Sequence, residues 1–85
     1  MSAPTTLANG AEVLEYTERR PEGNGFRRHG VALCRWHEEY VVWTIFYRAE
    51  DEAWFAESGD YFQSDVAAAV DAYRQRAGMS TGASA

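Results

Sequence analysis

The run Tyr40–Arg48 is the most continuously hydrophobic stretch of the chain, and it predicts a central β-strand. Its residues are β-branched or aromatic at nearly every position, so both alternating faces of the strand are apolar. Acidic residues bound it on both sides, at Glu38-Glu39 and Glu50-Asp51-Glu52. A strand that is apolar on both faces must be covered on both, so we expect it in the middle of a sheet.

The neighbouring segments predict the remaining elements. Residues 28–36 and 53–57 have strand patterns, and 12–17 predicts a short edge strand, whereas Ser58-Gly59-Asp60 predicts a turn. Ser64 is the expected helix N-cap, apolar residues then recur at helical spacing, and Gly78 ends the helix.

This order predicts an α+β fold, in which an antiparallel three- to four-stranded sheet carries one C-terminal helix on one face (β-β-β-α). We expect a single domain over residues 12–78. Small and polar residues dominate both ends of the chain, which predicts a disordered arm over 1–11 and a disordered tail over 79–85.

Hairpin pairing assigns the strand residues to two faces. If Glu38-Glu39 is the first hairpin loop and Arg48 pairs with Ala53 in the second, one face carries no charge, and we expect the helix to cover it. That face consists of Ala32, Cys34, Trp36, Val41, Trp43, Ile45, Tyr47, Trp54 and Ala56.

The opposite face is then left open, and it is apolar enough to predict a partner-binding surface. Its expected members are Val31, Leu33, Arg35, Tyr40, Val42, Thr44, Phe46, Arg48, Phe55 and Glu57. A second candidate surface is an acidic rim near His37, formed by Glu38, Glu39, Glu57 and Asp60.

The charge balance narrows the class of partner. The chain has thirteen carboxylates, eight arginines and no lysine, which gives a net charge of -5. Such a field opposes non-specific binding to nucleic acid and favours a basic partner. The single cysteine excludes an internal disulfide, and residues 1–10 lack a secretory signal, so we expect a cytoplasmic protein that does not associate with membranes.

Catalytic and metal-binding patterns are incomplete. Cys34 and His37 have the spacing of one zinc-ligand pair, but the sequence lacks a second pair. Cys34 with His29 or His37 lacks an orienting third group for nucleophilic catalysis. We therefore expect no metal, no cofactor and no enzyme activity, with Cys34 as a small core residue.

One motif resembles a known family. The run Gly59-Asp60-Tyr61-Phe62-Gln63-Ser64 and the alanine-rich helix ending in Tyr73 are similar to the last strand and helix of a group of DNA-binding domains. These three-stranded-sheet-plus-helix domains occur in apetala-type transcription factors and at the amino termini of tyrosine recombinases. The resemblance covers residues 29–77, with one extra residue before Ser64 and another before Tyr73. It implies an open sheet face that lies in the DNA major groove.

Together these patterns predict a small acidic, non-catalytic protein-interaction module. Its sharper form is an inhibitor encoded by a phage or mobile element, of the anti-CRISPR or anti-restriction type, whose sheet face and acidic rim block a partner. Two alternatives stay open: a sequence-specific DNA-binding domain that uses the open sheet face, and a homodimeric structural protein.

Overall fold

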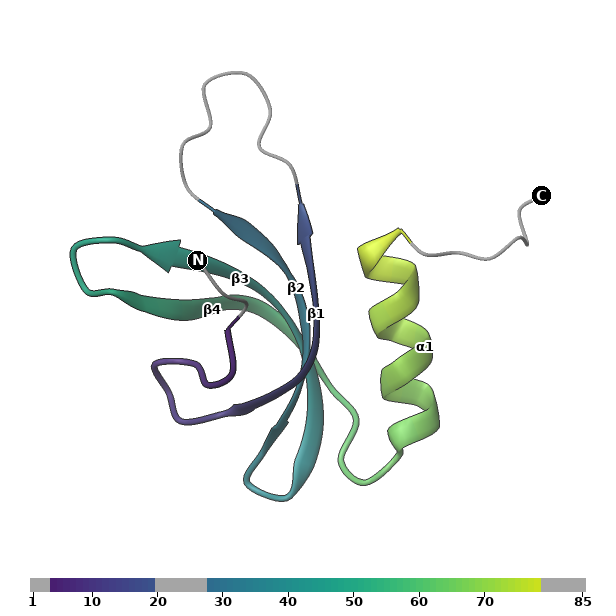
Figure 1. Cartoon of the computed structure of the whole chain (residues 1–85). Helices are drawn as coiled ribbons and strands as arrows, with labels where there is room; N and C mark the ends of the chain where they lie inside the picture. The colour runs from purple at the N-terminus through teal and green to yellow at the C-terminus, as the bar shows by residue number, and fades with distance from the viewer. Residues whose placement is uncertain (1–3, 20–27, 79–85) are drawn as a thin grey trace.

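Four antiparallel strands and one C-terminal helix make up the protein, which confirms the predicted α+β class. The computed structural model describes residues 4–19 and 28–78. The predicted tail, 79–85, lies outside these residues. The strands follow the order β1-β2-β3-β4 across the sheet, and the helix lies on one side of it (Figure 1). The elements are β1 (Glu12–Arg19), β2 (His29–Trp36), β3 (Glu39–Arg48), β4 (Ala53–Tyr61) and α1 (Val66–Ala77).

The loop of the β2–β3 hairpin has the predicted length of two residues but begins one residue earlier than the sequence suggested. Trp36 pairs with Glu39, so the loop is His37-Glu38 and the predicted loop Glu38-Glu39 is wrong. The real register differs from the predicted one by two residues. Because side chains alternate with a period of two, this shift leaves every residue of β2 and β3 on the face to which it was assigned.

The second hairpin has the predicted register near its turn, with Arg48 paired to Ala53. The turn predicted over Ser58-Gly59-Asp60 is wrong, because β4 continues to Tyr61. A register shift opposite Thr44 absorbs one extra residue, as a β-bulge does, and pairing then resumes. Glycine at position 59 therefore serves the sheet rather than a turn.

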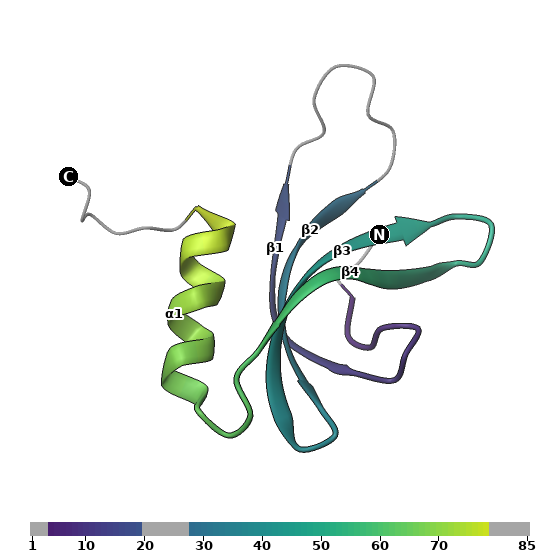
Figure 2. The ribbon, with the colours of Figure 1, turned by 180° about the vertical axis from the view of Figure 1, so that it is seen from behind.

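The helix covers the face that we expected to be open, so the predicted placement of α1 is wrong. Ala69 and Tyr73 pack against Val31, Leu33 and Val42, all of which are buried. Figures 1 and 2 show α1 on one side of the sheet and the N-terminal arm on the other. The side chains of this face are mostly short and aliphatic beneath α1, so a helix can approach it closely.

The other face curls around the N-terminal arm, for which the prediction of disorder is wrong from residue 4 to residue 11 (Figure 1). Leu7 joins Trp43 and Trp54 in the core on this side. The amide of Val13 donates to the carbonyl of Thr5 at 3.0 Å, and Ala8 N–H donates to Trp54 C=O at 2.8 Å. The arm thus bridges both edge strands and covers apolar rings that the helix leaves uncovered.

Capping fixes the two ends of α1. Asp65 is the N-cap in place of the predicted Ser64, since its carboxylate accepts from the Ala68 amide at 3.0 Å. At the other end, Gly78 adopts the left-handed conformation (φ 79°), which confirms it as the stop.

Candidate functional site

The helix divides the sheet face that was predicted to bind a partner. Val31, Leu33 and Val42 are buried beneath α1, where no partner reaches them. Tyr40 is half-buried and packs against the same cluster. Thr44 accepts a hydrogen bond from the guanidinium of Arg76 on α1 at 3.3 Å. The centre of the predicted face is therefore part of the fold.

The rest of the predicted face lies at two separate ends of the sheet. Phe46 stacks on Phe55 where β3 and β4 extend away from α1, with ring centroids 6.0 Å apart. The Arg48 guanidinium lies 5.2 Å from the Phe55 ring centroid and pairs with Asp51 at 3.1 Å. Arg35 is exposed at the opposite end of β2. These residues do not form one continuous surface.

The predicted acidic rim is divided as well. Asp60 accepts from the Arg76 guanidinium at 2.7 Å, and Glu57 is exposed beside the bulge in the middle of β4. Only Glu38 and Glu39 remain together, at the β2–β3 turn. Within residues 4–19 and 28–78, neither of them forms an ion pair.

A cluster of aromatic rings sits beside these two carboxylates. Trp43 is buried, with 4% of its surface exposed. Its indole packs edge-on against Trp36 (centroids 5.4 Å, 66°) and Tyr61 (5.9 Å, 87°). Tyr61 is 53% exposed, and Trp36 is half-buried. Gly59 makes this packing possible, because a Cβ at that position would fall inside the Trp43 indole.

The β2–β3 turn holds this end of the sheet in a costly conformation. His37 (φ 51°) and Glu38 (φ 65°) are both left-handed, as a two-residue type I′ turn requires. Asparagine and glycine are the usual residues there, and other side chains cost roughly 1–2 kcal/mol each. The His37 ring lies 4.4 Å from that of Trp36, centroid to centroid, and is held beside the cluster.

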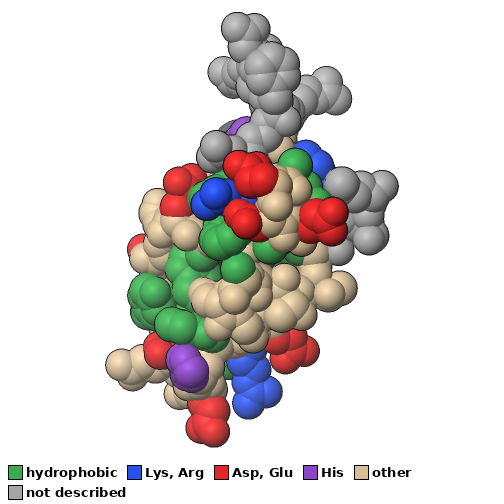
Figure 3. Space-filling model, turned by 90° about the vertical axis from the view of Figure 1, so that its left-hand side faces the viewer, with side chains coloured by type: hydrophobic (Ala, Val, Ile, Leu, Met, Phe, Trp, Pro, Cys, Tyr) green, Lys and Arg blue, Asp and Glu red, His purple; other side chains and the backbone are tan. Residues whose placement is uncertain are grey.

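We call this surface the aromatic end, defined as Trp36, His37, Glu38, Glu39 and Tyr61. Figure 3 views the side of the molecule away from α1, where hydrophobic side chains reach the surface between groups of acidic ones. Sequence reasoning found the two glutamates and His37, but it placed Trp36 under the helix and ended β4 before Tyr61. Trp54 and Ala56 lie on the Trp43 side of the sheet, and unbroken alternation would put Tyr61 on the other side. The bulge shifts the alternation by one residue and so brings Gly59 and Tyr61 to the Trp43 side.

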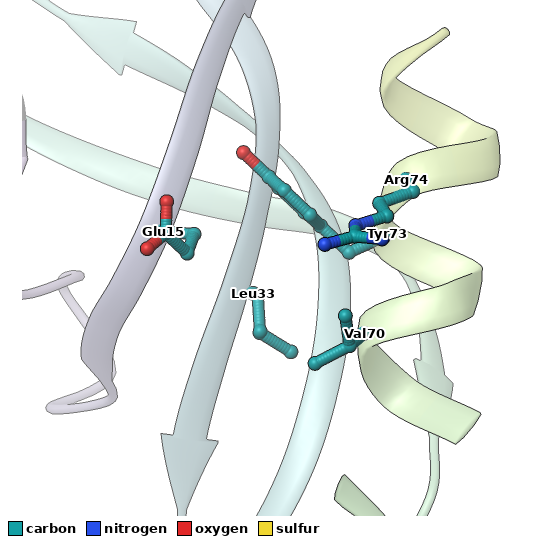
Figure 4. Close-up of a pocket in the computed structure, with 5 residues that line it drawn as sticks. All are labelled: Glu15, Leu33, Val70, Tyr73 and Arg74. Atoms are coloured by element: carbon teal, nitrogen blue, oxygen red, sulfur yellow. The ribbon is translucent and has the colours of Figure 1, made fainter. Parts of the chain in front are cut away.

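A pocket of about 310 Å³ lies on the helix side, between β1 and α1 (Figure 4). Leu33 and Val70 supply its apolar wall, and Glu15 and Arg74 bring opposite charges to its rim. The Tyr73 hydroxyl is already hydrogen-bonded to Thr17 at 2.6 Å. The volume is near the lower limit of ligand pockets, about 300 Å³, so we consider the pocket a weaker candidate than the aromatic end.

The residues considered for catalysis do not come together. Cys34 is fully buried, and burial raises the pKa of its thiol to about 12, so it remains protonated at neutral pH. His37 is exposed on the turn. In the described part of the chain, no group of three or more His, Cys, Asp or Glu side chains could hold a metal ion. No helix in that part is long and apolar enough to cross a membrane.

The chain matches no known protein family, no curated protein and no solved structure. The resemblance to sheet-plus-helix DNA-binding domains therefore stays a prediction. The function has to be argued from the surface itself.

Proposed function

We propose that the protein is a non-catalytic interaction module that docks a partner protein on its aromatic end. The observation that carries this proposal is the exposure of Tyr61 above a buried Trp43. Tyrosine and tryptophan supply much of the binding energy at protein interfaces, because they bury a large area and lose few rotamers. An aromatic ring buries roughly 150–250 Å² when it is fully covered.

Contacts within the fold hold the rings of the aromatic end in place, which supports the proposal because pre-organised side chains lose less entropy on binding. Trp36 contacts both Trp43 and Tyr61, and its indole nitrogen donates to the Asn9 carbonyl at 3.3 Å. The left-handed turn adds to this argument, since backbone strain tends to occur at functional sites. A sequence selected for stability alone would favour asparagine and glycine at positions 37 and 38.

Charge favours a partner that is a different, basic protein. Two copies docked through the same surface would bring Glu38 and Glu39 against their own symmetry mates, and each copy carries a net charge of -5. Nucleic-acid phosphates would meet the same repulsion. The face that a DNA-binding reading requires is covered by α1 at Val31, Leu33 and Val42.

Inhibition of a nucleic-acid-binding protein is the biological role that this chemistry fits best. Grooves that bind nucleic acid are lined with arginine and lysine, and those that bind single strands also stack bases on aromatic rings. An end with carboxylates and exposed rings presents the complementary groups to such a groove.

Site-specific crosslinking in the cell that encodes the protein tests the proposal. A photoreactive benzoylphenylalanine at position 61 keeps an aromatic ring at the site, and the same residue at Gln75, exposed on α1, is the control. We expect one discrete crosslinked protein from position 61 and none from Gln75. Equal crosslinking from both positions, or no product at position 61, would contradict the proposal. A product of twice the chain mass would support the homodimer instead.

A further inference from the structure

The fold contains two places where an aromatic ring and a carboxylate together hold an arginine. In the first, the Arg28 guanidinium lies 5.1 Å from the Trp54 ring centroid, and its Nε donates to Glu18 at 2.8 Å. This hydrogen bond holds the pKa of the Glu18 carboxyl below its usual value. The ring attracts the cation by its negative face, and the carboxylate neutralises its charge.

The second place is at the β3–β4 turn. Arg48 lies 5.2 Å from the centroid of Phe55, and its Nε is 3.1 Å from a carboxylate oxygen of Asp51. The two sites share no residue, and their rings, Trp54 and Phe55, are neighbours on β4 whose side chains point to opposite faces of the sheet. The same arrangement, in which a ring and a carboxylate both contact a guanidinium, thus occurs twice in this small domain.

The aromatic end also has an aromatic ring next to a carboxylate, the two groups that hold the guanidinium in the other sites. Glu39 pairs with Trp36 in the sheet, so both side chains leave the same face with Cβ atoms roughly 4.5–5.5 Å apart. Tyr61 follows on β4, 6.5 Å from Trp36 between ring centroids. Within residues 4–19 and 28–78, no arginine lies over either ring, and Glu39 forms no ion pair.

We infer that the aromatic end binds an arginine side chain of the partner, stacked on Tyr61 or Trp36 and paired with Glu39. The inference rests on the proposed function and names the chemical group that the partner brings. Arginine fits better than lysine, because its planar guanidinium stacks on rings and is more weakly hydrated than an ammonium. The negative field of the protein would draw a basic segment toward this end.

Peptide binding followed by NMR tests the inference directly. The probe is a short peptide with arginine alternating with glycine, and its control is the same peptide with citrulline, a neutral isostere. The three tryptophan indole N–H signals report the site. We expect saturable shifts of the Trp36 signal but not of the Trp54 signal, and at least about tenfold weaker binding of the citrulline peptide.

Four substitutions locate the effect. Tyr61→Ala should weaken arginine-peptide binding about 5- to 30-fold, and Tyr61→Phe should retain it. Glu39→Gln should weaken binding several-fold and reduce its salt dependence. Glu52→Gln removes the same charge at the other turn and should change affinity less than twofold. Since Tyr61 is largely exposed, its variants should keep the dispersed amide spectrum of the folded protein.

Two results would overturn the inference: equal binding of the citrulline peptide, or equal loss from Glu39→Gln and Glu52→Gln. Its failure is distinguishable from failure of the proposed function. A partner that crosslinks at position 61 while the arginine peptide does not bind would leave an interaction module that recognises another group. Arginine binding without a crosslinked partner would show the reverse.

Discussion

The β2–β3 turn and the β3–β4 turn contain the same kinds of residue, but the fold pairs their charges differently. Both are acidic, and both lie next to aromatic residues on the flanking strands. At the β3–β4 turn, Arg48 pairs with Asp51 and lies over Phe55, so the charges and the ring are used within the fold. At the β2–β3 turn, Glu38 and Glu39 have no ion-pair partner in the described part of the chain.

The two turns also differ in backbone conformation. Glu52 is the one left-handed residue of the β3–β4 turn, whereas both loop residues of the β2–β3 turn are left-handed. An acidic turn that satisfies its own charges is a structural feature. An acidic turn that is strained, unpaired and next to exposed rings is a candidate for binding, and the difference is visible only after the chain is folded.

The largest expected effect concerns the ring that supports the aromatic end. Trp43→Ala should destabilise the protein by about 3–5 kcal/mol, because it removes a buried indole and leaves a cavity beneath Trp36 and Tyr61. Phe55→Ala, at the half-buried ring of the other turn, should cost less than half as much. Urea unfolding of both variants measures the difference. Equal losses would show that the two ends are built alike.

A second test exchanges the strained turn for the preferred one. His37→Asn together with Glu38→Gly should raise the free energy of unfolding by about 1–2 kcal/mol, because asparagine and glycine adopt left-handed conformations at lower cost. The same variant should bind the arginine peptide more weakly, since one carboxylate is lost.

Glu52→Gly is the matched control for that exchange. It relieves a single left-handed residue (φ 51°), so it should stabilise by about 1 kcal/mol and leave peptide binding unchanged. If the double variant proved less stable than the parent, the contact between the His37 imidazole and Trp36 would outweigh the backbone strain, and the turn would be structural.

The sequence predicted the strands and the helix of this fold better than it predicted how they pack together. Alternation located the strands, and the capping glycine at position 78 located the end of α1. The helix face was missed because Tyr40–Arg48 is apolar on both sides, and alternation sorts residues into faces without saying which face a helix covers. The cover of the other face was missed because Leu7 is a single large apolar residue in a segment of small polar ones.

The candidate site shows the same limit. Glu38 and Glu39 were predicted as part of a charged surface from the predicted layout of the strands. Asp60 differs from these two glutamates because it pairs with Arg76. Arg76 lies 16 residues after Asp60 in the sequence, and the two side chains meet only because α1 packs on the sheet. Tyr61 was missed because the bulge that carries β4 past Glu57 has no local sequence signal.

The smallest expected effect compares a carboxylate that has an internal arginine with one that does not. The Arg28 hydrogen bond lowers the pKa of Glu18, so this pair stabilises the folded state above the unfolded pKa of glutamate, about 4.3. This contribution to stability is lost as the pH falls through the pKa of Glu18 in the folded protein, which is lower than the unfolded one. Because both side chains are partly exposed, Glu18→Gln should cost at most about 1 kcal/mol at pH 7 and less at pH 3.

Glu39→Gln should leave the free energy of unfolding at pH 7 within about 0.5 kcal/mol of the parent, while it weakens peptide binding. Urea unfolding at the two pH values, with the peptide titration alongside, measures both variants. A stability loss in Glu39→Gln as large as that in Glu18→Gln would mean that Glu39 already has a partner within the chain. The acidic side chains of both turns would then be paired within the fold, and the turns would differ only in geometry.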